Sequence, residues 1–532
     1  MLPRPGDRKG GLLHRGFSGN QTGLMMKARS IPALLTLALL AVFSGCKEDA
    51  PELAVRWRFG GADGLRSQTG APVLRALLSH SNAPALAERL RPRAAKAALD
   101  WLSGTAAADP AVTQAQPLVS DLLSHESAGE VWRRGDGSKE VFVAVRITAE
   151  RAPLWNDRYP AVVKSLAPGL AGAWVSAEKG WLFAVSPSDS PRAKAFRARV
   201  LASASNPSRL LELEKSPGQW PGLQATAVAT NGAVAWSGVL RLPGLPQLSL
   251  KDWQHPTNLI RDPLVSLTAI RGVTPQVLGL LGLDRYTQGG ELGQMYLWAQ
   301  AESPFQSYAV VHVNDSAPVL QAANADLSRR YSTNSEPGKL DGLVMYDAGK
   351  QILGLNSAPG VLPMLAGTAD HKPGFLGFSM VPRQRSTQPV PRELLQQLQQ
   401  PGLVLYDWEV TSENFVHWWA NLQVLDLSMG LNPSPGDGLA NTWLTDGLGK
   451  VDNTVTQVRQ SGPGEFGWSR KAPAGLTALE WVALGRWLDP ATPRKPKAAR
   501  AVSPAPMTLP EAPAPKAAPT APGSARGPSV KH

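Results

Sequence analysis

Short strand-like segments alternate with helical segments through most of this chain, and this alternation restricts its possible folds more than any other feature. Residues 53–60 have the composition of a strand, while residues 84–102 carry apolar side chains at three- and four-residue spacing, which is typical of a helix with one buried face. Asn231-Gly232 stands between two apolar segments and predicts a type I′ hairpin turn, because both residues tolerate positive φ. The pattern predicts an α+β fold with antiparallel sheets and helices on one face.

The order strand, helix, hairpin and helix recurs loosely in residues 141–204, 308–355 and 403–488. The first two of these segments begin a helix with Ala-Pro, and proline is well tolerated at the first helical position. We therefore expect two or three loosely repeated modules. The chain then divides into a leader and signal peptide (1–45), an N-terminal α+β module (46–215), a hairpin-rich connecting region (216–300), C-terminal α+β modules (301–489) and a tail (490–532).

The beginning of the chain has the pattern of an export signal. Lys27 and Arg29 precede the apolar run 31–42, which is too short to span a membrane comfortably, and Ser44-Gly45-Cys46 follows directly. Cys46 is the only cysteine, so an internal disulfide is impossible. This string resembles the lipobox of bacterial lipoproteins, although Phe43 stands where leucine is usual.

The resemblance to a lipoprotein signal implies both a modification and a location. It implies cleavage before Cys46, attachment of fatty acids such as palmitate to Cys46, and a lipid anchor in the bacterial cell envelope. Lys47, in place of aspartate, favours the outer membrane or its periplasmic face under the sorting rule of enterobacterial lipoproteins. Each buried CH₂ group adds about 0.8 kcal/mol, so several acyl chains would make the anchoring effectively permanent.

The positive charge of the chain lies mainly at its two ends. Residues 1–45 carry a net charge of +5 and residues 490–532 carry +6, out of +12 for the whole sequence. The body is therefore close to neutral, and we expect it to bind no nucleic acid, because such binding draws its affinity from basic surfaces. The tail combines eleven prolines with no aromatic residue and predicts a disordered basic segment.

Taken together, the lipobox, the Trp-rich strand and helix segments and the Pro/Ala-rich tail resemble a group of bacterial exported lipoproteins that have no assigned activity. The resemblance covers most of the chain and includes no diagnostic catalytic motif. It implies no particular reaction, substrate or cofactor.

Asp407 and Glu409 are the only residues that suggest an enzyme. They lie two positions apart on an expected strand and so share a face. A pair of carboxylates is what glycoside hydrolysis needs, and Asp407-Trp408-Glu409 resembles the end of the chitinase motif. Gly402 and Leu405, however, occupy positions where that family has carboxylates, and Leu403 stands at the glycine of the motif. We therefore expect an exposed polar strand face, with a secreted glycan hydrolase as the alternative.

Other catalytic and metal sites are not indicated. Ser79-His80 and Ser124-His125 bring suitable residue types together, but neighbours in sequence seldom form a triad. The histidines have no ligand spacing, and the sequence has no phosphate-binding loop. We therefore predict no metal and no cofactor.

Most of the 17 tryptophans are expected to pack in the core, including Trp174, Trp181, Trp236 and Trp298. Trp155, Trp220 and Trp253 lie near the ends of elements and could instead stack on sugars or peptides. The sequence as a whole predicts a membrane-anchored envelope lipoprotein with a non-enzymatic binding or scaffolding role, whose partner is an envelope protein or a glycan.

Overall fold

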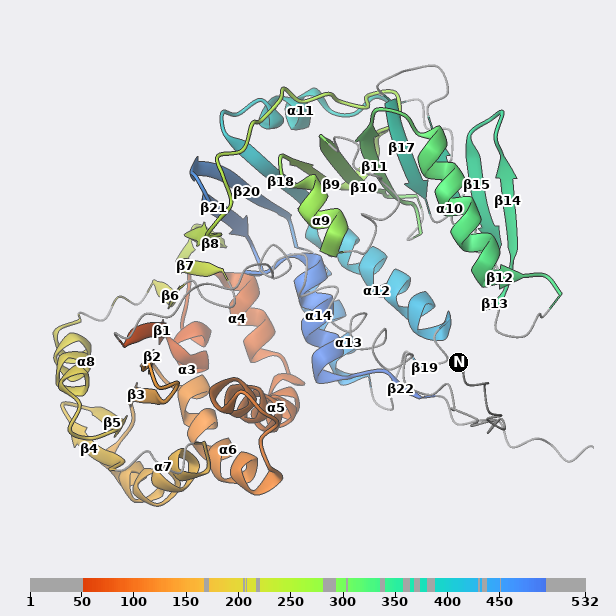
Figure 1. The fold of residues 1–532 in the computed structure, drawn as a ribbon. Helices are drawn as coiled ribbons and strands as arrows, with labels where there is room; N and C mark the ends of the chain where they lie inside the picture. Colours follow the sequence, from red (N-terminus) through yellow and green to blue (C-terminus); the bar gives the residue numbers. More distant parts are fainter. Residues whose placement is uncertain are drawn as a thin grey trace, which may run out of the picture. The chain divides into compact units, whose positions relative to one another are not determined.

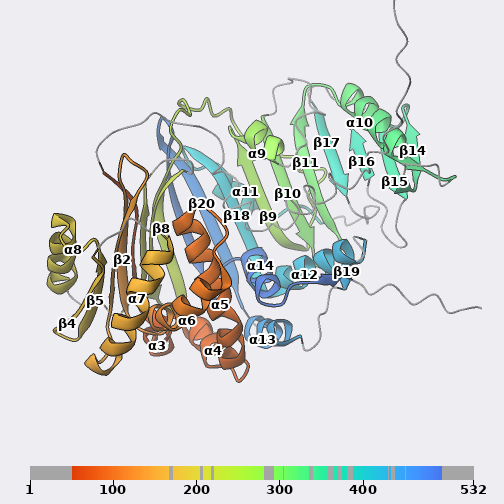
Figure 2. The ribbon, with the colours of Figure 1, turned by 60° about the horizontal axis from the view of Figure 1, so that its bottom comes forward.

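One continuous antiparallel sheet organises the body of the protein in the computed structural model (Figures 1 and 2). Among the residues that the structure describes, this sheet has 18 strands. From one edge to the other the strands are β4 (Trp174–Glu178), β5 (Trp181–Ser186), β3 (Lys139–Val145), β2 (Ser127–Arg133), β1 (Glu52–Phe59), β6 (Arg209–Lys215), β7 (Gly222–Thr230), β8 (Ala233–Arg241), β21 (Glu465–Ala472), β20 (Asn453–Gly462), β18 (Leu403–Val410), β9 (Leu264–Arg271), β10 (Gln294–Gln300), β11 (Ser307–Val313), β17 (Gly374–Ser379), β16 (Met364–Gly367), β15 (Ile352–Asn356) and β14 (Leu343–Asp347).

The structure describes these ranges: 51–166, 172–203, 206, 208–216, 221–280, 293–302, 305–334, 340–356, 364–367, 374–379, 388–428, 431–432, 438–449 and 451–493. Cys46 and nearly all of the Pro/Ala-rich tail therefore lie outside the described residues. The described residues through Thr492 form one compact unit. Outside the main sheet, the short elements are the strands β12 (Tyr331–Ser332), β13 (Leu340–Asp341), β19 (Leu431–Asn432) and β22 (Thr492–Pro493) and the 3₁₀ turn η2 (Ala149–Arg151).

The two halves of the sheet place their strands in the same order relative to the chain. Outward from the central pair β8 and β21, each half has its last three strands in reverse order and then its first strands in chain order. On one side the order is β8, β7, β6, β1, β2, β3, β5. On the other side it is β21, β20, β18, β9, β10, β11, β17. The three modules expected from the sequence are not confirmed, because β18, which opens the third of them, corresponds to β6 rather than to β3. Residues 216–300, expected as a connecting region, contribute β7 to β10 to the same sheet.

The helices are distributed unequally between the two faces of the sheet. On one face, which we call the helical face, lie α3 (Gly61–Arg66), α4 (Pro72–Ser79), α5 (Ala83–Ser103), α6 (Asp109–Ser124), α7 (Ala152–Leu166), α9 (Thr274–Leu280), α10 (Ala317–Arg330), α12 (Thr411–Ser428), α13 (Leu439–Leu448) and α14 (Ala478–Leu488). Only α8 (Pro191–Ala202) and α11 (Arg392–Leu398) pack on the other face, which we call the open face, within the described part of the chain. The α+β class with an antiparallel sheet is confirmed.

Strand β3 shows how the sequence fills both faces. Val143 and Val145 point toward α5, α6 and α7, whereas Phe142 and Ala144 point toward α8. A strand buried on both faces needs apolar side chains at successive positions rather than alternation, and residues 141–145 provide them. The N-terminal half is therefore three layers thick at this point.

Local sequence signals predicted some elements correctly and missed others. The turn at Asn231-Gly232 has φ values of 39° and 88°, as the hairpin prediction requires. Helix α5, which covers the expected helix 84–102, continues through Pro92 in its interior. Helix α6 was not anticipated, and it contains both Pro110 near its start and Pro117 in its interior.

Candidate binding site

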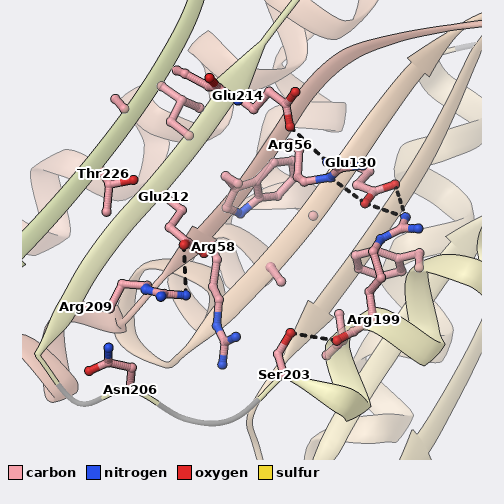
Figure 3. Close-up of a pocket in the computed structure, with 18 of the residues that line it drawn as sticks. Arg56, Arg58, Glu130, Arg199, Ser203, Asn206, Arg209, Glu212, Glu214 and Thr226 are labelled. Carbon is pink, nitrogen blue, oxygen red and sulfur yellow. Dashed lines mark hydrogen bonds and ion pairs between the residues drawn. The ribbon is translucent and has the colours of Figure 1, made fainter. Parts of the chain in front are cut away.

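A groove of about 740 Å³ lies on the open face, between α8 and the strands β1, β2, β6, β7 and β8 (Figure 3). Arginine and glutamate side chains dominate its charged lining, with Arg56, Arg58, Arg199 and Arg209 against Glu130, Glu212 and Glu214. Phe196 and Val200 of α8 provide an apolar wall. The lining residues include no histidine and no cysteine.

Glu130 organises the charges at the side of the groove nearest α8. Its side chain is 2% exposed, and it accepts hydrogen bonds from Arg56 Nε at 2.9 Å, from Arg199 Nη2 at 2.6 and 2.8 Å and from Trp132 Nε1 at 2.9 Å. The two guanidinium groups are far more accessible, at 39% for Arg56 and 46% for Arg199. The carboxylate of Glu130 is therefore buried beneath the guanidinium groups of Arg56 and Arg199, which it binds.

Strand register explains how distant residues meet here. Arg56 of β1 lies opposite Glu130 of β2 on one side and opposite Glu214 of β6 on the other. Residues directly opposite in an antiparallel pair have side chains on the same face, so the three charges form one row across the sheet. Arg56 Nη1 donates to Glu214 Oε2 at 2.9 Å, which completes the row (Figure 3).

A second charged row runs two residues farther along the same strands. Arg58 lies opposite Glu212, and its Nη2 donates to Glu126 Oε1 at 2.7 Å. Glu212 in turn pairs with Arg209 at 2.8 Å. Beyond Glu212 the row continues over the open face as Thr226, Ser237, Ser469 and Gln457, each opposite the next. The groove thus opens onto a polar strip that crosses the centre of the sheet.

Several guanidinium hydrogens of the groove remain available to a ligand. Among the residues that the structure describes, no hydrogen-bond partner lies at Nη2 of Arg56, Nη1 of Arg58, or Nε and Nη1 of Arg199. Arginine presents its hydrogens in a planar fork that matches a carboxylate or a phosphate. The groove can therefore offer preorganised donors to an acidic group.

The alternating sequence of β1 is a signal for this site. In β1 the residues alternate as Val55, Arg56, Trp57 and Arg58, which predicts one apolar and one charged face. Trp57 points to the helical face and lies over Gly129, where an added Cβ would be 2.0 Å from the indole ring. The arginines consequently point to the open face.

Asp407 and Glu409 share a face of β18, as expected, but it is the helical face, and neither residue lines the groove. Glu409 is only 2% exposed, so the expectation of an exposed strand face is wrong for this residue. Both of its oxygens are engaged, Oε1 by the backbone N–H of Ala478 at 2.7 Å and by Thr411, and Oε2 by Asn414 at 2.6 Å. These bonds tie β18 to α12 and α14.

Burial determines how these two carboxyls titrate. It raises the pKa of Glu409 to about 7, and the negative charge of Asp407 contributes to the rise, while the hydrogen bonds from Ala478, Asn414 and Thr411 oppose it. Burial also raises the pKa of Asp407, against a 2.6 Å hydrogen bond from Thr268 Oγ1. The two groups are thus polar members of a packed interface between the sheet and the helices.

The histidines that follow Ser79 and Ser124 each lie near an aspartate. His80 Nε2 lies 3.3 Å from Asp446, and His125 Nδ1 lies 3.2 Å from Asp63. In the described part of the chain, no cluster of three His, Cys, Asp or Glu residues could hold a metal ion.

Of the tryptophans named above, those that the structure describes are buried or partly buried, except for Trp174. Trp155 is 1% exposed and donates to Asp121, so it packs rather than stacks on a ligand. Trp253 packs on Tyr296 and under the guanidinium of Arg271. Trp174, expected in the core, is 36% exposed because it begins β4, the strand at the edge of the sheet. Trp220 lies outside the described residues.

No helix in the described ranges is both long and apolar enough to cross a membrane. Comparisons with protein-family models, with curated proteins and with solved structures find no match to this chain.

Proposed function

We propose that this protein is a bacterial envelope lipoprotein, anchored to the membrane through acylated Cys46, whose body binds or scaffolds an envelope partner without catalysing a reaction. The anchor is supported by the export signal that ends in Ser44-Gly45-Cys46 and by the presence of only one cysteine in the sequence. The outer membrane is the proposed location, on the strength of Lys47.

The observation that carries the binding role is the arginine-lined groove on the open face. Its guanidinium groups are held by buried or half-buried carboxylates and still have N–H groups without a partner among the described residues. A site of this kind loses little side-chain entropy when it binds, because its donors are already fixed. The ligand proposed for it is an envelope component that presents carboxylates, either an acidic peptide segment or a glycan with acidic groups.

The alternative, a glycan hydrolase that uses Asp407 and Glu409, has less support. A general acid must reach the leaving oxygen of its substrate, whereas both oxygens of Glu409 are occupied inside the protein. The raised pKa of Glu409 is the one observation in favour of that alternative. If the wild type hydrolyses chitin or peptidoglycan fragments and Glu409→Gln abolishes this activity, the non-enzymatic proposal is wrong.

The anchor is tested with Cys46→Ala. We expect this variant to lose labelling by a palmitate analogue and to escape processing by the lipoprotein signal peptidase, because the thiol is the acceptor of the diacylglyceryl group. Unchanged labelling of the Cys46→Ala chain would contradict the proposed anchor.

The groove is tested with defined probes, poly-glutamate and isolated peptidoglycan, offered to the whole protein. We expect Arg199→Gln to weaken binding of the preferred probe about tenfold, which corresponds to the loss of one charge-assisted hydrogen bond. Lys471→Gln, which removes an exposed cation of β21 outside the groove, is the matched control. Equal binding by both variants, or no binding of either probe by the wild type, would count against the groove as the site.

A further inference from the structure

The proposed anchor restricts which part of the body can face the membrane. Glu52, the first residue of β1, is six positions after Cys46. A chain spans at most about 3.3–3.6 Å per residue, so this connection reaches no more than roughly 20 Å. If Cys46 carries the lipid, as the proposed function requires, the start of β1 must lie within that distance of the bilayer surface.

The start of β1 lies beside a group of cations at the same end of the sheet. Glu52 is opposite Arg133 at the end of β2, and Arg133 is opposite Lys139 at the start of β3. On the other side of β1, Val55 is opposite Lys215 at the end of β6. Arg133 is exposed and has no ion pair among the described residues. We call Arg133, Lys139 and Lys215 the basic end cluster.

The positive charges of the basic end cluster repel one another. Burial lowers the pKa of Lys139 and of Lys215, and the positive charge of Arg133 lowers both further. The nearby acidic groups are Glu52, which favours the charged form of Lys215, and Asp136 at the tip of the β2–β3 hairpin. An excess of positive charge therefore remains beside the start of β1, where the tether ends.

Trp101 adds an exposed aromatic side chain to this cluster. It lies at the end of α5, is 42% exposed, and has Lys139 Nζ 5.5 Å from its ring centroid. Its carbonyl oxygen also accepts a hydrogen bond from Lys139 at 3.2 Å. Tryptophan is favoured at membrane–water interfaces, and lysine and arginine beside it attract anionic headgroups.

We propose that Trp101 and the basic end cluster form the membrane-facing surface of the protein and contact anionic phospholipid headgroups. The tether length, the positive charge and the exposed indole all point to this end of the sheet. The strands then rise from the bilayer, and the groove lies on the side of the body.

A single-cysteine probe tests this orientation in the mature, lipidated protein reconstituted into vesicles of phosphatidylcholine and phosphatidylglycerol. Asp136→Cys places an environment-sensitive fluorophore at the β2–β3 hairpin. Ser67→Cys places the same fluorophore after α3, which follows the opposite end of β1. We expect a quencher carried on lipid headgroups to quench the probe at position 136 and to leave the probe at position 67 unaffected. Equal quenching, or stronger quenching at position 67, would overturn the proposed orientation.

The same experiment separates failure of the orientation from failure of the anchor. In the wild type, Cys46 reacts with the fluorophore only if it carries no lipid, so labelling of the wild type would refute the proposed lipoprotein itself. If the wild type stays unlabelled, the quenching result bears on the orientation alone.

Charge variants test the role of the cations. Arg133→Gln with Lys215→Gln should weaken the association of the probe with anionic vesicles about fivefold for each charge removed, and have little effect in phosphatidylcholine alone. Arg75→Gln with Lys471→Gln, two exposed cations toward the other strand ends, is the matched control. Equal effects of the two double variants would show that the cluster does not contact the lipid.

Discussion

Glu409 Oε1 accepts a 2.7 Å hydrogen bond from the backbone N–H of Ala478, so a carboxylate on the sheet satisfies a donor at the beginning of α14. The first turn of a helix leaves such donors without partners inside the helix. Thr477 and Glu480 satisfy others through a capping box. The interaction joins two segments far apart in sequence, and it gives Glu409 a structural role that the sequence did not indicate.

The raised pKa of Glu409 predicts a pH-dependent stability. In the folded protein the carboxyl keeps its proton up to about pH 7, whereas in the unfolded chain it releases it near 4.5. The stabilisation is therefore complete below the unfolded value and is lost as the pH rises through 7, by up to about 3 kcal/mol. Urea unfolding at pH 5 and pH 8 measures this loss. Glu409→Gln should abolish most of this pH dependence of the free energy of unfolding, whereas Glu413→Gln, at an exposed carboxyl of α12, should preserve it. An unchanged pH dependence in Glu409→Gln would contradict the assignment of the effect to Glu409.

Removing the buried carboxylate of the groove should destabilise the fold more than removing an exposed one. Glu130→Ala leaves Arg56 and Arg199 without their shared buried partner, and we expect a loss of about 2–3 kcal/mol in the free energy of unfolding. Glu214 is 36% exposed, so Glu214→Ala should cost less than about 1 kcal/mol. Chemical denaturation of both variants provides the comparison, and similar losses would refute the central role of Glu130.

Gly129 should tolerate no side chain, because the ring of Trp57 occupies the space. An added Cβ would lie 2.0 Å from that ring, so Gly129→Ala must displace the indole from the core and should cost about 2–3 kcal/mol. Gly467 of β21 has no atom within 4 Å of such a Cβ, and Gly467→Ala should stay within about 0.5 kcal/mol of the wild type. Thermal unfolding with both variants tests the difference, which disappears if Trp57 can move freely.

Deleting residues 494–532 should leave the thermal midpoint within about 2 °C of the wild type. The segment is rich in proline and alanine and has no aromatic residue, so it has little apolar area to bury. About 1 kcal/mol corresponds to roughly 2–4 °C even in domains of 150–250 residues. A larger decrease in a calorimetric scan would show that the tail packs on the body.

Local patterns in the sequence predicted many of the elements, although not α6, and did not predict their arrangement. Strand β18 begins at Leu403, where the third segment of the sequence pattern begins, and the turn at Asn231 follows from backbone preferences alone. The pairing of strands could not be predicted in this way, because the pairing of β8 with β21 depends on contacts between residues that no local pattern connects.

The site was harder to predict for the same physical reason. The groove takes its charges from four separate segments, with Arg56, Glu130, Arg199 and Glu214 brought together by strand register and by α8. For Asp407 and Glu409, the two-residue period gave the shared face correctly. The pattern of β18 alone does not show whether that face is buried, because the helices that cover it, α12 and α14, are formed by later parts of the chain.

The central pairing of β8 with β21 also determines when the sheet can be completed. Trp236 of β8 donates a 2.7 Å hydrogen bond to the carbonyl oxygen of Gly475, which lies 239 positions later. A chain that is synthesised from its N-terminus can complete β1 to β8 long before residues 465–472 are made. Throughout that interval β8 is an edge strand with unpaired backbone groups, open to any passing strand. The N-terminal half therefore keeps an exposed strand edge along β8 until residues 465–472 pair with it.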